Sequence, residues 1–163
     1  MAGFFVFMEY KYWQHVRVPK YVFSQRKYNT HNINLLVDIV EESLPVFRSM
    51  VDFDDQLLIT LKPMRGKTKG IYDPNVCMVE SEYRYDDVFL FLTVIAHELV
   101  HAEQYHTGRF DSEWRGTDYL YRWYDTYYSI IERDYNKYLP PWEQEAYERQ
   151  EGLALAVCSE LGL

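Results

Sequence analysis

The segment His97-Glu98-Leu99-Val100-His101 combines residue types and a spacing that suit metal chemistry. Residues four apart on a helix lie one turn apart on the same face, so the imidazoles of His97 and His101 can bind one cation. Glu98 follows the first of these ligands directly, and its carboxylate can reach a water molecule on the metal. The pattern predicts a zinc site in which Glu98 is the general base of a hydrolysis reaction.

A catalytic zinc site usually has three protein ligands and one open position, so a third ligand must come from elsewhere in the chain. The candidates are Glu143, Glu145, Asp118, His106 and Asp111. Glu143 and Glu145 point about 200° apart on an ideal helix, so only one of them can face the metal. We favour Glu143, because it shares one helix face with Ala146 and Ala154, whose small side chains permit close approach to the zinc helix.

Three segments together resemble a known group of proteins. They are His97–His101 with the Ala102-Glu103-Gln104-Tyr105 that follows it, Trp114-x-Gly116, and Pro141-Trp142-Glu143-Gln144-Glu145-Ala146-Tyr147. They resemble the small metallopeptidases that phages often carry and, more broadly, the gluzincin branch of the zincins. The resemblance covers residues 89–152. It implies a peptidase that uses Zn²⁺ as cofactor and a protein or peptide as substrate, with Glu143 of a Glu-x-x-Ala element as the third ligand.

Peptide hydrolysis also requires a donor that stabilises the negatively charged oxygen of the transition state. Tyr135, Tyr138 and Tyr147 lie near Glu143 in the sequence and are the candidates for this role. The resemblance further implies that the substrate pairs with an edge strand beside the motif helix. Val76–Glu80 is the segment that we expect to form this edge.

The helices that must position these residues can be read from hydrophobic spacing and capping residues. Helices are predicted over residues 32–50, 87–106 and 142–160. Thr30 and Asp87 are expected N-caps, Pro45 is expected to end or kink the first helix, and Gly108 is expected to stop the second. Pro141 suits the start of the last helix.

The strands are less sharply defined. One or two are predicted within residues 4–24, followed by strands over 56–61 and 76–80. Residues 109–139 fit either strand or helix, with Ile130–Arg133 favouring helix. The order of elements predicts a single α+β domain over residues 1–163, with a small mixed sheet packed on the motif helix and the C-terminal helix closing the metal site. By resemblance, this fold is zincin-like.

Composition narrows the possible partners. A net charge of −8 argues against nucleic-acid binding, which needs a basic face. The apolar run Phe4–Met8 is too short to span a membrane. Cys77 and Cys158 lie far apart in the sequence and form no CxxC motif, so a disulfide scaffold is not expected. This favours a reducing compartment such as the cytoplasm, which for a phage-encoded protein is that of the host.

The alternative to a peptidase is a zinc-stabilised interaction module without turnover, such as a phage protein that binds a host factor. Glu98 argues against this alternative, because a purely structural zinc site has no use for a base beside its ligand.

Overall fold

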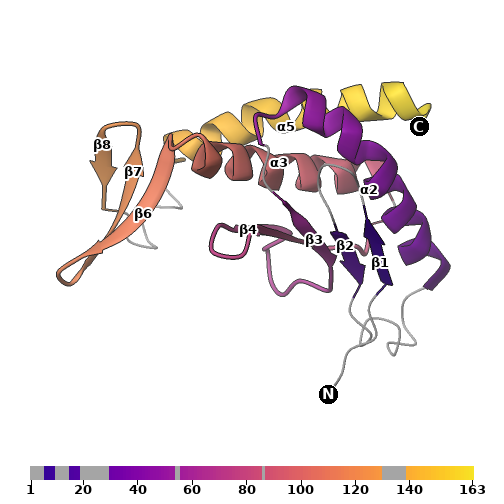
Figure 1. Ribbon diagram of the computed structural model, residues 1–163, viewed down its shortest axis with the longest axis horizontal. Helices are drawn as coiled ribbons and strands as arrows, with labels where there is room; N and C mark the ends of the chain where they lie inside the picture. Colours follow the sequence, from indigo (N-terminus) through magenta and orange to yellow (C-terminus); the bar gives the residue numbers. More distant parts are fainter. Residues whose placement is uncertain (1–5, 10–14, 19–29, 54–55, 86, 130–138) are drawn as a thin grey trace, which may run out of the picture.

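The computed structural model describes residues 6–9, 15–18, 30–53, 56–85, 87–129 and 139–163. These residues form an α+β fold in which three helices accompany two small sheets (Figure 1). The α+β class predicted from the sequence is therefore confirmed. None of the described helices has the length and the apolar run that crossing a bilayer requires.

The larger sheet has five strands in the order β1-β2-β3-β5-β4. Their bounds are β1 (Val6–Glu9), β2 (His15–Val18), β3 (Leu58–Leu61), β4 (Gly70–Asp73) and β5 (Met78–Ser81). The pairs β1–β2 and β4–β5 are antiparallel, whereas β2–β3 and β3–β5 are parallel. The sheet is thus mixed, as expected.

The three helices are α2 (Thr30–Met50), α3 (Val88–His106) and α5 (Pro141–Leu161). Figure 1 shows α3 and α5 side by side along their length, with α2 crossing beside them. The other side of α3 packs against β4 and β5. The motif helix is therefore held between the sheet and the C-terminal helix.

The ends of α3 follow the capping signals in the sequence. The Asp87 carboxylate accepts a hydrogen bond of 2.8 Å from the Phe89 amide, which satisfies one free donor at the helix start. At the other end Gly108 adopts a left-handed conformation with a φ of 71°, and its amide donates to the Tyr105 carbonyl. Pro45, by contrast, does not end α2, which continues through it to Met50. The buried side chains of Leu44 and Phe47 on either side of Pro45 anchor this last part of the helix to the core.

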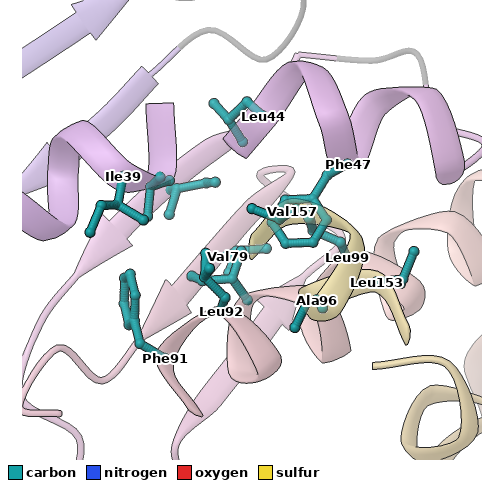
Figure 2. Close-up of a cluster of buried hydrophobic side chains, with 14 of the residues drawn as sticks. Ile39, Leu44, Phe47, Val79, Phe91, Leu92, Ala96, Leu99, Leu153 and Val157 are labelled. Atoms are coloured by element: carbon teal, nitrogen blue, oxygen red, sulfur yellow. The ribbon is translucent and has the colours of Figure 1, made fainter. Parts of the chain in front are cut away.

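A single apolar cluster joins the helices to the sheet (Figure 2). The labelled members come from α2, β5, α3 and α5 and are Ile39, Leu44, Phe47, Val79, Phe91, Leu92, Ala96, Leu99, Leu153 and Val157. Ala146 and Ala154 of α5 are also fully buried in this cluster. Their small side chains allow α5 to pack closely on α3.

The second sheet is antiparallel and consists of β6 (Phe110–Arg115), β7 (Asp118–Trp123) and β8 (Thr126–Tyr128). Figure 1 shows it projecting beyond the ends of α3 and α5. Gly116, with a φ of 63°, lies in the tight turn between β6 and β7, where a side chain would be strained. The segment that fitted either strand or helix is thus strand as far as Tyr128. The expected helix at Ile130–Arg133 lies outside the described residues.

The edge of the larger sheet differs from the prediction. We expected Val76–Glu80 to form the edge beside the motif helix, but β5 lies between β3 and β4, and β4 is the edge. The sequence of β4, Gly-Ile-Tyr-Asp, begins and ends with residues that disfavour strands, so its pattern is too weak to detect. It becomes a strand because it pairs with β5 from Gly70 to Asp73.

Candidate metal centre

The structure brings His97, His101 and Glu143 together between α3 and α5. The Nε2 atoms of the two histidines are 3.1 Å apart. The two carboxylate oxygens of Glu143 lie 3.2 Å from Nε2 of His97 and 3.3 Å from Nε2 of His101. One turn of α3 supplies both imidazoles, and the first turn of α5 supplies the carboxylate. These three residues could hold a metal ion.

Two glutamines fix the orientation of the imidazole rings. Nδ1 of His97 lies 2.9 Å from Oε1 of Gln150, and Nδ1 of His101 lies 2.8 Å from Oε1 of Gln104. The amide of Gln104 cannot turn around, because its Nε2 donates to the carbonyl of Trp142 at 2.9 Å. Nδ1 of His101 therefore donates to Gln104, and Nε2 of each ring faces Glu143, where it could bind a metal ion.

The two Nε2 atoms and the Glu143 carboxylate lie close enough together to share one cation. Burial alone would raise the pKa of Glu143, but hydrogen bonds and charges from His101 and His97 lower it to about 2. Burial likewise opposes a charge on His101, yet Glu143 and Glu98 raise its pKa. The carboxylates around the two rings therefore stabilise positive charge at the cluster.

Glu98 lies between the metal cluster and the edge strand β4. Its side chain is buried, and burial raises the pKa of its carboxyl against the opposing effects of His101, His97 and the Tyr72 amide, which donates a hydrogen bond to it. A β-carbon at Gly70 would lie only 2.6 Å from Oε1 of Glu98. The absence of a side chain at Gly70 therefore leaves the space that the Glu98 carboxylate occupies.

The remaining candidate ligands have other contacts. Glu145 accepts hydrogen bonds from Arg109 at 2.6 and 2.8 Å and from Gln104 at 2.7 Å. It therefore holds Gln104, the partner of His101, and is not itself at the cluster. The His106 ring packs edge-on against Phe53. The last two candidates, Asp111 and Asp118, lie on the second sheet and are exposed. None of these four belongs to the cluster.

A cleft of about 760 Å³ opens over the three clustered residues and Glu98. Tyr147 lines it, and its ring packs on that of His97 with centroids 4.8 Å apart. Of the tyrosines considered as donors to a substrate oxygen, Tyr147 is therefore at the site, whereas Tyr135 and Tyr138 lie outside the described residues.

Sequence reasoning missed several residues of this site. Gln104 and Gln150 follow the ligands His101 and Glu143 at helical spacings of three and seven residues, and this spacing is a signal that could have found them. Gly70 and Tyr72 had no such signal, because only the pairing of β4 with β5 brings them to Glu98.

Tyr85 was also missed. Its hydroxyl is buried against the cleft, with no hydrogen-bond partner in the part of the chain that the structure describes. Burial and the charge of Glu82 raise its pKa to about 12, so the hydroxyl keeps its proton and can donate to a ligand.

A search for relatives adds no independent guide to the function. Searches against models of protein families, curated proteins and solved structures find no match for this chain.

Proposed function

We propose that this protein is a zinc-dependent peptidase, with Zn²⁺ held by His97, His101 and Glu143. One observation carries the proposal: His97, His101 and Glu143 could hold a metal ion, and the buried carboxyl group of Glu98, which is not one of these ligands, lies beside them in the same open cleft. Ligand atoms about 2.05 Å from a tetrahedral zinc lie roughly 3.3 Å apart. Here the two Nε2 atoms are 3.1 Å apart, one oxygen of Glu143 lies 3.2 Å from Nε2 of His97, and its other oxygen lies 3.3 Å from Nε2 of His101, so the three side chains approach the spacing of zinc ligands. Three protein ligands would leave one position for water.

Zinc in this site would lower the pKa of a water molecule to about 7 and polarise the substrate carbonyl. Glu98 accepts the proton of the attacking water, because its side chain is adjacent to the cluster and is accessible from the cleft. Its raised pKa then suits it to pass that proton to the leaving amine. The hydrogen bond from the Tyr72 amide holds the carboxylate in position for both transfers, and the missing side chain at Gly70 leaves room for it.

The arrangement of elements supports a zincin-like, gluzincin-type fold. α3 carries the His-Glu-x-x-His motif, α5 carries the glutamate ligand, and a mixed sheet covers the other side of α3. β4 is one of the two edge strands of the larger sheet as described, and its residues Gly70, Ile71 and Tyr72 line the cleft. An open strand edge beside the metal favours an extended polypeptide as the substrate.

The experiment compares the wild type with Glu98→Gln. Both proteins are analysed for bound metal and incubated with a mixed peptide library, and products are identified by mass spectrometry. We expect one zinc per chain in both, and a loss of cleavage of about 10²- to 10⁴-fold in the variant, which is the usual contribution of a general base. Glu160→Gln, an exposed change near the end of α5, serves as the control and should cleave normally.

Two results would contradict the proposal. Full zinc occupancy with no cleavage by the wild type would indicate a structural metal in an interaction module. Zinc well below one per chain in the wild type would show that the cluster is not a zinc site.

A further inference from the structure

One face of the second sheet is almost entirely aromatic. The register pairs Ser112 with Tyr121 and Trp114 with Tyr119, and directly paired residues share a face. Phe110 and Trp123 lie on the same face as these pairs. The opposite face of β6 and β7 carries the charged residues Asp111, Glu113, Arg115, Asp118 and Arg122. The side chains that β6 and β7 place on the aromatic face carry no charge.

Five rings on this face and on α5 form a continuous series, which we name the aromatic track: Trp142, Phe110, Tyr121, Tyr119 and Trp114. The centroids of Phe110 and Trp142 are 4.7 Å apart, and those of Tyr121 and Trp142 are 5.3 Å apart. The series continues from Tyr121 to Tyr119 at 5.3 Å and from Tyr119 to Trp114 at 5.0 Å. Each ring therefore contacts the next.

The inner end of the track belongs to the cleft over the metal centre. Trp142, Phe110 and Tyr121 line that cleft together with His97 and Glu143. The outer end lies on the projecting part of the second sheet, where Tyr119 is 38% exposed and Trp114 is 70% exposed. Tyr119 and Trp114 therefore present exposed aromatic surface next to the rings that line the cleft.

We propose that the aromatic track extends the substrate site and binds an uncharged, apolar stretch of an extended polypeptide beyond the bond that is cut. The inference rests on the proposed peptidase function. A polypeptide is the occupant because the track is continuous with a cleft that has an open strand edge beside the metal. The stretch is apolar because the five side chains of the track carry no charge that could pair with a charged side chain.

The geometry also sets the length of the substrate. The track follows β6 from Phe110 to Trp114, a span of five residues whose first and last Cα atoms are roughly 13 Å apart along the strand. A peptide that only fills the metal cleft does not reach Trp114. An extension of about four to six residues on the amino or the carboxyl side of the cleaved bond is needed to cover the track.

The test uses Trp114→Ala with matched short and extended peptides that contain the same cleaved bond. The extension is placed on either side and is apolar in one set and charged in another. One of the two sides should let the apolar extension reach the track. For that peptide, we expect the KM of Trp114→Ala to be about 3- to 10-fold higher than that of the wild type, the effect of one lost aromatic contact, while kcat stays unchanged. The short peptide should be cleaved equally by both proteins.

Tyr127→Ala is the control, because Tyr127 is 44% exposed and pairs with Arg122 on the charged face of the same sheet. It should leave both peptides unaffected. The proposal is overturned if Trp114→Ala changes the short and extended peptides equally, if it changes neither, or if charged extensions are preferred.

The proposed function and this inference can fail separately. If the wild type cleaves peptides but Trp114→Ala leaves the extended peptides unaffected, only the inference about the track is wrong. If the wild type cleaves nothing, the track is tested by fluorescence anisotropy, with labelled short and extended peptides and zinc-loaded Glu98→Gln. Trp114→Ala is then combined with Glu98→Gln. If only the extended apolar peptide binds more weakly to the double variant, the track is supported, and unchanged binding would overturn it.

Discussion

At the scale of single residues, the charges of the metal site balance. With zinc bound as proposed, the two imidazoles would be neutral, and the carboxylates of Glu143 and Glu98 would carry two negative charges that a divalent cation would neutralise. The supporting acceptors, Gln104 and Gln150, are uncharged. Carboxylates at those two positions would add a net charge to a site whose ligands are largely buried.

The first prediction concerns the glutamine behind His97. Gln150→Leu keeps the volume but removes the oxygen that accepts the Nδ1 proton, so the ring can rotate or change tautomer. We expect zinc affinity to fall about 10- to 100-fold, measured by competition with a chelating dye. Gln144→Leu, an exposed change on the same helix, should keep the affinity of the wild type. Equal affinities for all three proteins would remove the supporting role of Gln150.

At the scale of elements, the site depends on how closely β4 approaches α3. Gly70→Ala places a methyl group within 2.6 Å of Oε1 and 2.8 Å of Cγ of Glu98, so the carboxylate must move. We expect peptide cleavage to fall at least about tenfold, since a small displacement of a catalytic group has effects of this size, while zinc stays bound.

Gly152→Ala is the matched control for this change. A β-carbon at Gly152 on α5 meets nothing within 4 Å, so activity should be unchanged and stability slightly higher. If Gly70→Ala retained full activity, β4 would not position the proposed base. Assays of cleavage and zinc content on the same preparations separate these outcomes.

The sequence predicted the helices and the clustered residues well, because these depend on local spacing. α3 begins and ends within one residue of its predicted range, and helical spacing places His97 and His101 on one face. The edge of the sheet was wrong because β4 is a strand only through its pairing with β5, and pairing between distant segments leaves little trace in local sequence. The contacts of Gly70 and Tyr72 with Glu98 were hidden for the same reason.

At the scale of the whole molecule, a network of charges joins the parts around the metal site. The Glu103 carboxylate of α3 accepts hydrogen bonds from Arg149 of α5 at 2.7 and 2.9 Å and from Arg109, ahead of the second sheet, at 2.6 Å. It also accepts the Asp52 amide at 2.9 Å, just after α2. Arg109 continues the network to Glu145. One buried carboxylate thus connects the three helices to the start of the second sheet.

This network predicts a pH-dependent part of the stability. Burial alone would raise the pKa of Glu103, but hydrogen bonds from Arg149 and the Asp52 amide and the charges of Arg149 and Arg109 lower it. A lowered pKa in the folded state stabilises the protein above the unfolded value of about 4.3, and this stability is lost as the pH falls through the folded value.

Glu103→Gln should therefore reduce the free energy of unfolding by about 1.5–3 kcal/mol at pH 7, measured in urea. The difference from the wild type should shrink steadily below about pH 4.3. Glu151→Gln, an exposed change on α5, should stay within about 0.5 kcal/mol at every pH. A difference that does not depend on pH would mean that the charge of Glu103 does not stabilise the fold.

The second sheet lies in the chain between the two helices that provide the ligands. The chain leaves the body at Gly108 after α3 and returns at Pro140 before α5, so all of β6, β7 and β8 is inserted between His101 and Glu143. Arg109, Phe110 and Tyr121 of this insertion contact α5, so changes confined to the β6–β7 turn around Gly116 should disturb the two helices least. Under the proposed peptidase function, exchanging that turn would be a route to changing which polypeptides are cut while His97, His101 and Glu143 are kept.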